Sequence, residues 1–300
     1  MPLLQTEILI YFCIGLFNTT IVKTRKITIT PYGGLANRMR AMNSVIEFAK
    51  LSSIPVNVVW FSNFELNAPF GELFETPDYP MLRVKEAGCF DRFIYRSPRR
   101  HSLWLPLFTA PFLFDTTIYS ADFVRERDNG TLADRILNGG RIMIESCYDF
   151  GNYGDALSRN FIPKKDILSW VDEFVRDNFT SNTIGVHIRR TDNEQSIKNS
   201  PLSLFCDAMR REIELCDDTK FYVATDDMAT KRELKEIFGD RILSIETDCN
   251  RNSLQGMKEA VKEMWILSRT SKIYGSFYSS YSEIASQLGN IPLHILQKEM

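Results

Sequence analysis

The chain has 300 residues, of which 44% are hydrophobic and 25% charged, and its formal net charge is −2. This length is enough for two domains of about 150 residues, and the composition is that of an ordinary globular protein. A nearly neutral chain has no overall field to attract nucleic acid, so we expect no nucleic-acid partner. A small anionic ligand would have to be held by local arginines.

The cysteines and histidines predict neither a metal site nor a disulfide scaffold. The six cysteines are scattered without a C-x-x-C pair, and there are three histidines. Zinc sites need clustered ligands, and disulfide scaffolds are typical of short secreted chains. We therefore expect no metal and reduced thiols in a cytoplasmic protein.

Residues 1–25 form an apolar segment that precedes the regular pattern. The apolar stretch 8–22 is shorter than the roughly 20 residues of a spanning helix. Three basic residues, Lys23, Arg25 and Lys26, follow it and would keep the rest of the chain on the cytoplasmic side of a membrane. We expect a loosely ordered extension, a peripheral contact with the cytoplasmic face of a membrane, or a buried core element.

The first regular unit reads as strand, helix, strand. Residues 26–30 predict a strand, and Gly33 and Gly34 interrupt the pattern before apolar residues recur at helical spacing over 35–49. A second strand is predicted at 56–61. The segment 63–166 is rich in Phe, Pro and Arg without sustained periodicity, and we expect loops and short elements there, with one strand at 141–146.

Strand and helix alternate again in the C-terminal half. Strands are predicted at 183–188, 221–225, 241–245 and 272–276, and helices at 202–215, 228–238, 254–268 and 282–288. Short connections between them predict a mostly parallel sheet with helices on both faces. The sequence thus predicts an α/β fold of two Rossmann-like domains facing across a cleft, one at 26–165 and one at 166–300.

Polar clusters follow two of the predicted C-terminal strands. His187, Arg189 and Arg190 come at the end of the first, and guanidinium groups bind phosphate oxygens in pairs. The alternative is a strand end in which Asp192 pairs with an arginine. Asp226 and Asp227 follow the next strand; one would cap the helix that starts there, and the other would bind a base or ribose or stay solvated.

Two strand-to-helix turns could also bind an anion. Residues 275–283 (GSFYSSYSE) present hydroxyls and helix amides, although Ser280 and Glu283 also fit a purely structural capping box. Residues 33–38 (GGLANR) lack both the G-x-G-x-x-G pattern and a Walker lysine. We expect Asn37 and Arg38 to reach the cleft from the N-terminal domain, the alternative being that the glycines only make the turn.

The succession HIRRTD, FYVATDD, NSLQG…MWILS and GSFYSSYSEIA resembles the donor-binding half of the fucosyltransferase superfamily. In motif order it is most similar to the α1,6-fucosyltransferases of the core N-glycan and rhizobial nodulation types. The resemblance covers about residues 183–288, and GGLANR resembles the turn that opens many members. It implies a GT-B-like fold and inverting, metal-independent transfer of fucose from GDP-fucose to a glycan hydroxyl, with no cofactor besides this donor substrate.

The resemblance also implies roles for individual residues. Arg189 would bind the β-phosphate, Arg190 would support the diphosphate, and Ser279 and Ser280 would contact phosphate oxygens. The remaining donor-site candidates are His187, Asp226 and Asp227 at the guanine or ribose end, Glu263 in a slot where the family usually has an aspartate, and Gly34, Asn37 and Arg38 from the first turn.

The catalytic base departs from the family pattern. The acidic residue proposed as base in the family falls at Ile197, and Glu194 is the nearest carboxylate, so we predict Glu194 or a carboxylate of the N-terminal half. The acceptor, an oligosaccharide or polysaccharide precursor, would bind within 63–166, where aromatic rings could stack on sugars and Arg96–Arg100 could meet an acidic one. Alternatives are a transferase for another nucleotide sugar and a non-catalytic nucleotide- or glycan-binding relative.

Overall fold

The computed structural model describes residues 26–95, 105–191, 193–245 and 250–298. The predictions for residues 1–25, including membrane contact through 8–22, and those for Arg96–Arg100 and Asp192 lie outside the described residues. Within these four ranges, none of the helices has both the length and the hydropathy to cross a bilayer.

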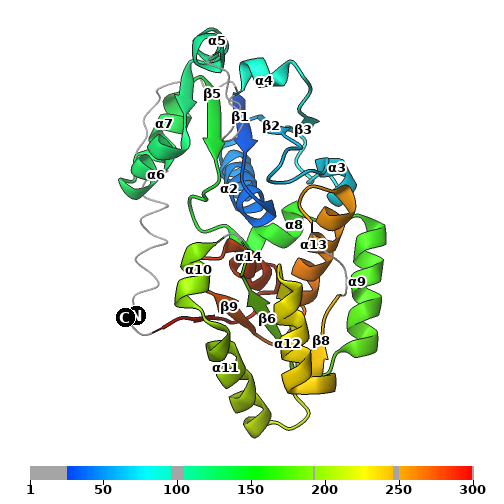
Figure 1. The fold of residues 1–300 in the computed structure, drawn as a ribbon. Coiled ribbons are helices and arrows are strands. Elements are labelled where there is room, and N and C mark those ends of the chain that lie inside the picture. Colours follow the sequence, from blue (N-terminus) through cyan, green and yellow to red (C-terminus); the bar gives the residue numbers. More distant parts are fainter. Residues whose placement is uncertain (1–25, 96–104, 192, 246–249, 299–300) are drawn as a thin grey trace.

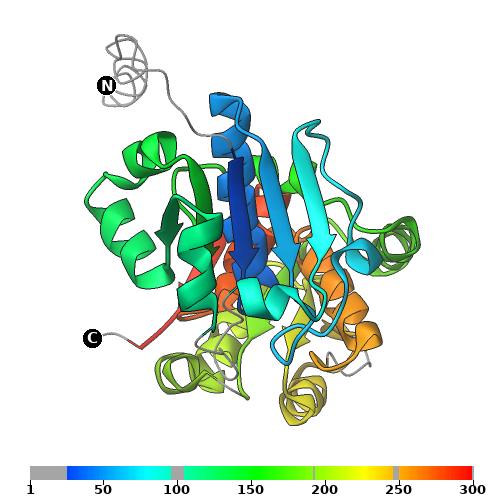
Figure 2. The same ribbon diagram turned by 90° about the horizontal axis from the view of Figure 1, so that it is seen from above.

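The N-terminal half is built on a five-stranded sheet in the order β3-β2-β1-β5-β4. Its strands are β1 (Lys26–Pro31), β2 (Val56–Trp60), β3 (Leu82–Glu86), β4 (Thr116–Ile118) and β5 (Arg141–Ser146). All their pairings are parallel, and Ile27 is in register with Val56 on one side and Ile142 on the other. Figure 2 shows β1, β2 and β3 side by side, seen from above.

The C-terminal half repeats this design with the order β10-β9-β6-β7-β8. Its strands are β6 (Thr183–Ile188), β7 (Lys220–Thr225), β8 (Ile242–Leu243), β9 (Ile273–Ser276) and β10 (Leu293–Leu296). His187, near the end of β6, is in register with Ala224 and Gly275, so the carboxyl ends of three parallel strands meet there. The two sheets lie one above the other in Figure 1, and the α/β prediction of two Rossmann-like units is confirmed.

Helices connect the strands in both halves. They are α2 (Leu35–Ser52), α3 (Phe70–Leu73), α4 (Asp91–Ile94), α5 (Leu105–Leu113), α6 (Ser120–Asp128), α7 (Leu132–Asn138), α8 (Leu157–Asn160), α9 (Lys165–Asn178), α10 (Glu194–Asn199), α11 (Leu202–Leu215), α12 (Met228–Phe238), α13 (Leu254–Leu267) and α14 (Ser280–Gly289), with single 3₁₀ turns at Gly154–Ala156 and Gly239–Arg241.

The strand predicted at 141–146 is confirmed as β5, and two strands without an individual prediction also lie within 63–166. β3 and β4 also belong to the sheet, each at one of its edges. β3 buries Leu82, and most of its other side chains are exposed to solvent. β4 has three residues. Neither strand therefore has the continuous apolar run of a central strand. The helix α9 and the edge strand β10 were also not predicted, whereas α11 and α12 have the predicted bounds.

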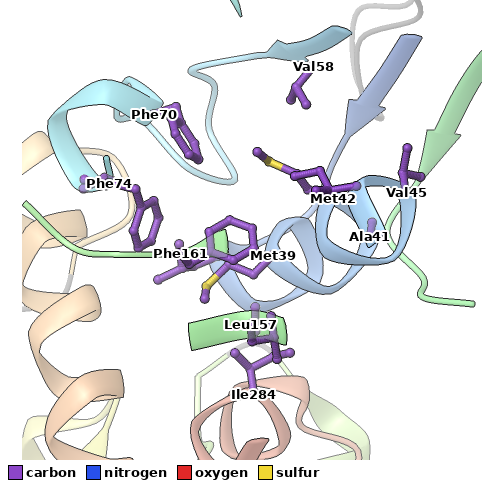
Figure 3. Packing of buried hydrophobic residues seen from close by; sticks show 14 of the residues in the cluster. Met39, Ala41, Met42, Val45, Val58, Phe70, Phe74, Leu157, Phe161 and Ile284 are labelled. Atoms are coloured by element: carbon purple, nitrogen blue, oxygen red, sulfur yellow. The ribbon is translucent and has the colours of Figure 1, made fainter. Parts of the chain in front are cut away.

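A hydrophobic core continues from one half into the other. Figure 3 shows Met39 of α2, Leu157 of α8 and Ile284 of α14 in the same cluster of buried side chains. α14 therefore packs against the N-terminal half although its strand, β9, belongs to the C-terminal sheet. This packing sets the relative position of the two walls of the cleft described below. The division of the chain at residues 165 and 166 stays a prediction.

Candidate functional site

A cleft of about 950 Å³ opens between the two sheets. Its N-terminal wall comes from the turn after β1, the first turns of α2 and the loop after β5. Its C-terminal wall comes from the segments that follow β6, β7 and β9 and from one side of α13. Because carboxyl ends of parallel strands usually carry the ligand site of such folds, this is where the predicted residues were expected.

Arg189 lies in this cleft, next to Asp226. Its Nη1 is 3.2 Å from Asp226 Oδ2, and both side chains are 19% exposed. Asp226 also accepts hydrogen bonds from the Arg190 amide at 2.8 Å and the Thr191 hydroxyl at 2.7 Å. Asp226 thus organises the loop after β6, and a guanidinium has five N–H donors, more than one carboxylate can accept. Arg189 can therefore keep this partner and bind an anion.

The structure does not bring Arg190 and Asp227 to the cleft lining. Asp227 is the N-cap of α12 and accepts from the amides of Ala229 and Thr230, at 3.2 and 3.0 Å. Hydrogen bonding from Thr230 holds the pKa of Asp227 below its usual range. The Arg190 guanidinium is partly buried, which lowers its pKa, and the charges of Asp227 and Asp226 oppose that shift. Asp227 thus serves as a helix cap, and Arg190 Nη2 is buried without a hydrogen-bond partner.

His187 forms part of the floor of the cleft. It is 4% exposed, and its ring stacks on that of Tyr281 with 4.8 Å between centroids. Burial, followed by the nearby charge of Arg189, lowers the pKa of His187 to about 3, so the imidazole is neutral at physiological pH. Its Nδ1 is buried without a hydrogen-bond partner. An unpaired buried polar atom at the wall of a cleft is a feature that a bound ligand can explain.

Glu263 lies on α13 and forms a buried ion pair that the sequence analysis missed. Its Oε1 is 3.1 Å from Lys231 Nζ, and the two side chains are 5% and 6% exposed. Lys231 also donates to the Ile245 carbonyl at 2.9 Å. The sequence feature that could have indicated this ion pair is the spacing of Lys231 and Leu234 on α12. Residues three apart share a helix face, so Lys231 lies on the buried face with Leu234. Glu263 lines the cleft, whereas Lys231 lies behind it.

The serine-rich turn ends at the N-terminus of α14, which opens into the cleft. Ser279 is the N-cap, its side chain makes no capping hydrogen bond, and it lines the cleft together with Ser280. Two side chains hold the turn from α10 and its N-cap: Asn193 donates to the Tyr278 carbonyl at 2.9 Å, and Ser196 to the Phe277 carbonyl at 2.6 Å. A helix N-terminus of this kind favours an anion through its amides and dipole.

The predicted capping box of Ser280 and Glu283 is wrong, because the helix begins one residue earlier than that motif requires. With Ser279 as N-cap, the third helical residue is Ser282, and its hydroxyl donates to the Ser279 carbonyl at 3.2 Å. Glu283 is thereby not part of a cap. Its carboxylate faces Arg40 of α2, with 3.8 Å between Oε2 and Nη1.

The first βα turn brings part of the predicted set to the cleft. Gly34 is the N-cap of α2, and both Gly34 and Asn37 line the cleft. Asn37 Oδ1 is buried without a hydrogen-bond partner. Gly33 has φ 85°, a conformation that favours glycine, and its amide donates to Glu65 Oε2 at 2.9 Å. A second helix N-terminus therefore opens into the same cleft.

The structure corrects the prediction that Arg38 reaches the cleft. Arg38 is fully buried and donates to the Gly33 carbonyl at 2.8 Å and to Asn63 Oδ1 at 2.9 Å, with a further bond to the Phe61 carbonyl. Position 38 faces the sheet, where backbone carbonyls satisfy the guanidinium and burial lowers its pKa to about 10. Arg38 thus stabilises the glycine turn and does not reach the cleft.

The predicted base, Glu194, is the first residue of α10 and lies exposed at the rim of the cleft. Ile197 is also exposed and does not line the cleft. The N-terminal wall contains side chains that sequence reasoning did not single out: Arg40, Arg127, Tyr148 and Asp149. In the four described ranges, no three His, Cys, Asp or Glu side chains are grouped as a metal site.

Two parallel sheets facing across one cleft define the GT-B class of α/β fold. Solved structures with this fold include NodZ α-1,6-fucosyltransferase soaked with GDP-fucose, with 19% identity, 89% of this chain and 93% of that chain covered, and a TM-score of 0.64. POFUT1 in complex with GDP-fucose has 11% identity, coverage of 93% and 99%, and a TM-score of 0.55.

NodZ from Bradyrhizobium gives similar values, with 18% identity, 88% and 92% coverage and a TM-score of 0.60. No family model and no curated protein matches the chain. At these identities the likeness establishes the fold. The fold predicted from the motif order, that of the fucosyltransferases, is thereby confirmed.

Proposed function

We propose that the protein is a glycosyltransferase that moves fucose from GDP-fucose to a hydroxyl of an oligosaccharide or polysaccharide-precursor acceptor, with inversion and without a metal ion. The observation that carries this proposal is that Arg189 and the open N-terminus of α14 line the same cleft. GDP-fucose is the molecule named in the NodZ and POFUT1 complexes that share the fold.

The reaction places its main electrostatic demand on the leaving group. As the bond between fucose and the diphosphate breaks, negative charge grows on the β-phosphate while the sugar becomes oxocarbenium-like. Preorganised donors aimed at such charge are usually the largest contribution to catalysis. Arg189 would supply the positive charge, and the amides and hydroxyls at Ser279 and Ser280 would supply uncharged donors.

The C-terminal wall also offers a site for the nucleotide base. Glu263 and His187 are buried at the lining, beside Met257 and Ala260. A carboxylate has only acceptors, and guanine presents an N–H and an amino group on its Watson–Crick edge. We propose that Glu263 reads guanine, with the neutral His187 beside it. Asp226, already bonded to the loop after β6, would act through Arg189.

A donor panel tests the proposal. Differential scanning fluorimetry with GDP, GDP-fucose, GDP-mannose and UDP-GlcNAc should show stabilisation by the guanine nucleotides and little by the uridine one. Release of GDP from GDP-fucose should then proceed in EDTA at the same rate as in magnesium.

Four outcomes would contradict parts of the proposal. Equal stabilisation by UDP-GlcNAc would refute guanine recognition, and faster turnover of GDP-mannose would favour a transferase for another nucleotide sugar. Loss of GDP release in EDTA, restored by magnesium, would refute metal independence. Tight binding of GDP without any turnover of GDP-fucose would favour a non-catalytic relative.

A further inference from the structure

Six carboxylates line the cleft among the described residues. Three of them have a partner within 3.2 Å, whereas Glu283 lies 3.8 Å from Arg40. The six are Glu65, Asp149, Glu194, Asp226, Glu263 and Glu283. Glu65 accepts from the Gly33 amide, Asp226 pairs with Arg189, and Glu263 pairs with the buried Lys231. A general base must be able to approach a reacting hydroxyl, so these three are poor candidates.

Glu283 lies on the same helix as the proposed leaving-group site and lines the same cleft. It lies four residues after Ser279, which is about 6 Å along a helix axis, and residues four apart share one helix face. In inverting glycosidases, the carboxyl group that protonates the leaving oxygen and the carboxylate that activates the nucleophile are about 6.5–9.5 Å apart. Because the glutamate side chain extends beyond this rise, Glu283 offers a carboxylate one helical turn away from an anion bound at Ser279 and Ser280.

The surroundings of Glu283 also suit a base. The Glu283 side chain is 48% exposed and can therefore reach a molecule in the cleft. Its partial burial and the neighbouring charge of Asp149 raise the pKa of this carboxyl, while Arg40 opposes the rise. Arg40 is itself fixed, since its Nε donates to the Cys147 carbonyl at 2.8 Å and its guanidinium lies 5.5 Å from the Tyr148 ring. Tyr148 adds an aromatic ring to the same wall, on which an acceptor sugar could stack.

We propose that Glu283 is the general base of the transfer, an inference that rests on the proposed function. The proton of the attacking hydroxyl passes to the Glu283 carboxylate while the hydroxyl oxygen forms its bond to C1 of fucose. The bond between C1 and the β-phosphate oxygen breaks, and its electron pair leaves with GDP, where Arg189 stabilises the charge. Glu283 thus replaces the acid that is absent at Ile197.

The test compares two nucleophiles and needs no knowledge of the natural acceptor. Water must lose a proton when it attacks the sugar, whereas azide is already an anion and needs no base. GDP release from GDP-fucose and formation of fucosyl azide are measured for the wild type, Glu283→Gln and Glu194→Gln. Glu173→Gln, on the exposed face of α9, is the matched control, since its side chain is 66% exposed.

For Glu283→Gln we expect hydrolysis to fall by about 10²–10⁴-fold, the usual contribution of general base catalysis, with fucosyl azide formed at the rate of the wild type. Hydrolysis within fivefold of the wild type overturns the inference, as does an equal loss with azide, which would indicate a binding role. The same selective loss in Glu194→Gln alone would assign the base to Glu194. A wild type that turns over GDP-fucose with neither nucleophile refutes the proposed function itself.

Discussion

Replacement of Arg189 by alanine removes the cation that we assign to the leaving group. The structure indicates that the fold would tolerate this change. Asp226 would lose a partner at 3.2 Å but keep the Arg190 amide at 2.8 Å and the Thr191 hydroxyl at 2.7 Å. A hydrogen bond to a charged group contributes about 1.5–3 kcal/mol, so we expect the free energy of unfolding to fall by no more than about 3 kcal/mol.

The effect on catalysis should be larger, because the interaction strengthens as charge develops. Loss of one such preorganised donor costs about 2.7–4 kcal/mol of transition-state stabilisation, and each 1.36 kcal/mol is tenfold in rate. We therefore expect kcat/KM of Arg189→Ala to fall by about 10²–10³-fold. Most of the loss should appear in kcat, since binding that is gained only in the transition state does not change KM.

Steady-state release of GDP from GDP-fucose, with circular dichroism and thermal unfolding as checks on the fold, measures this prediction. Arg190→Ala is the matched control: it deletes a neighbouring arginine whose side chain does not line the cleft, and its kcat/KM should stay within about fivefold of the wild type. Arg189→Lys keeps the charge but not the planar fork and should recover only part of the rate. A folded Arg189→Ala with the turnover of the wild type would refute the assignment.

Three further predictions concern buried polar groups. Lys231→Met removes the buried cation that pairs with Glu263 and should lower the free energy of unfolding by about 3–5 kcal/mol. Lys231→Met combined with Glu263→Met should regain most of this stability but not GDP binding, as measured by thermal unfolding and calorimetry. Folding lowers the pKa of His187 from 6.5 to about 3. Between these two pH values the unfolded chain binds more protons than the folded protein, so the free energy of unfolding decreases as the pH falls through this window. Urea unfolding at pH 4–6.5 should therefore show a slope that His187→Gln reduces by up to about 1.4 kcal/mol per pH unit. Arg38→Met removes three hydrogen bonds and leaves the carbonyls of Gly33 and Phe61 without this donor, whereas Asn63 Oδ1 keeps the amides of Glu65 and Leu66. The change should cost about 3 kcal/mol or more, visible as a lower Tm; an unchanged Tm would contradict the buried position of Arg38.

Several features of the candidate site could be predicted from residue type and order. Arg189 and the serine turn were assigned to one cleft because each follows a strand of a parallel sheet, and carboxyl ends of parallel strands lie at one edge. The structure places both there. Of the two adjacent aspartates, local rules required only that one cap the helix. Only the structure shows that Asp227 does so and that Asp226 holds Arg189.

Other features depended on contacts between distant segments. Arg38 looked like a cleft residue because it is charged and follows a glycine turn, but carbonyl and amide oxygens near the end of β2 satisfy it in the interior. The buried pair of Lys231 and Glu263 joins two helices 32 residues apart in the chain. No local pattern reports such a pairing, because what makes it favourable is the low dielectric of the interior that forms only on packing.

By itself, the sequence determined the alternation of strands and helices and the polar residues that end the C-terminal strands. Both follow from local periodicity and chain connectivity, which act over a few residues. Only the tertiary structure decided how closely each carboxylate of the cleft is paired. Glu283 became a candidate base because α14 packs across both halves of the chain and directs it toward Arg40. A side chain's electrostatic role is set by its neighbours in space, and those neighbours come from both sheets.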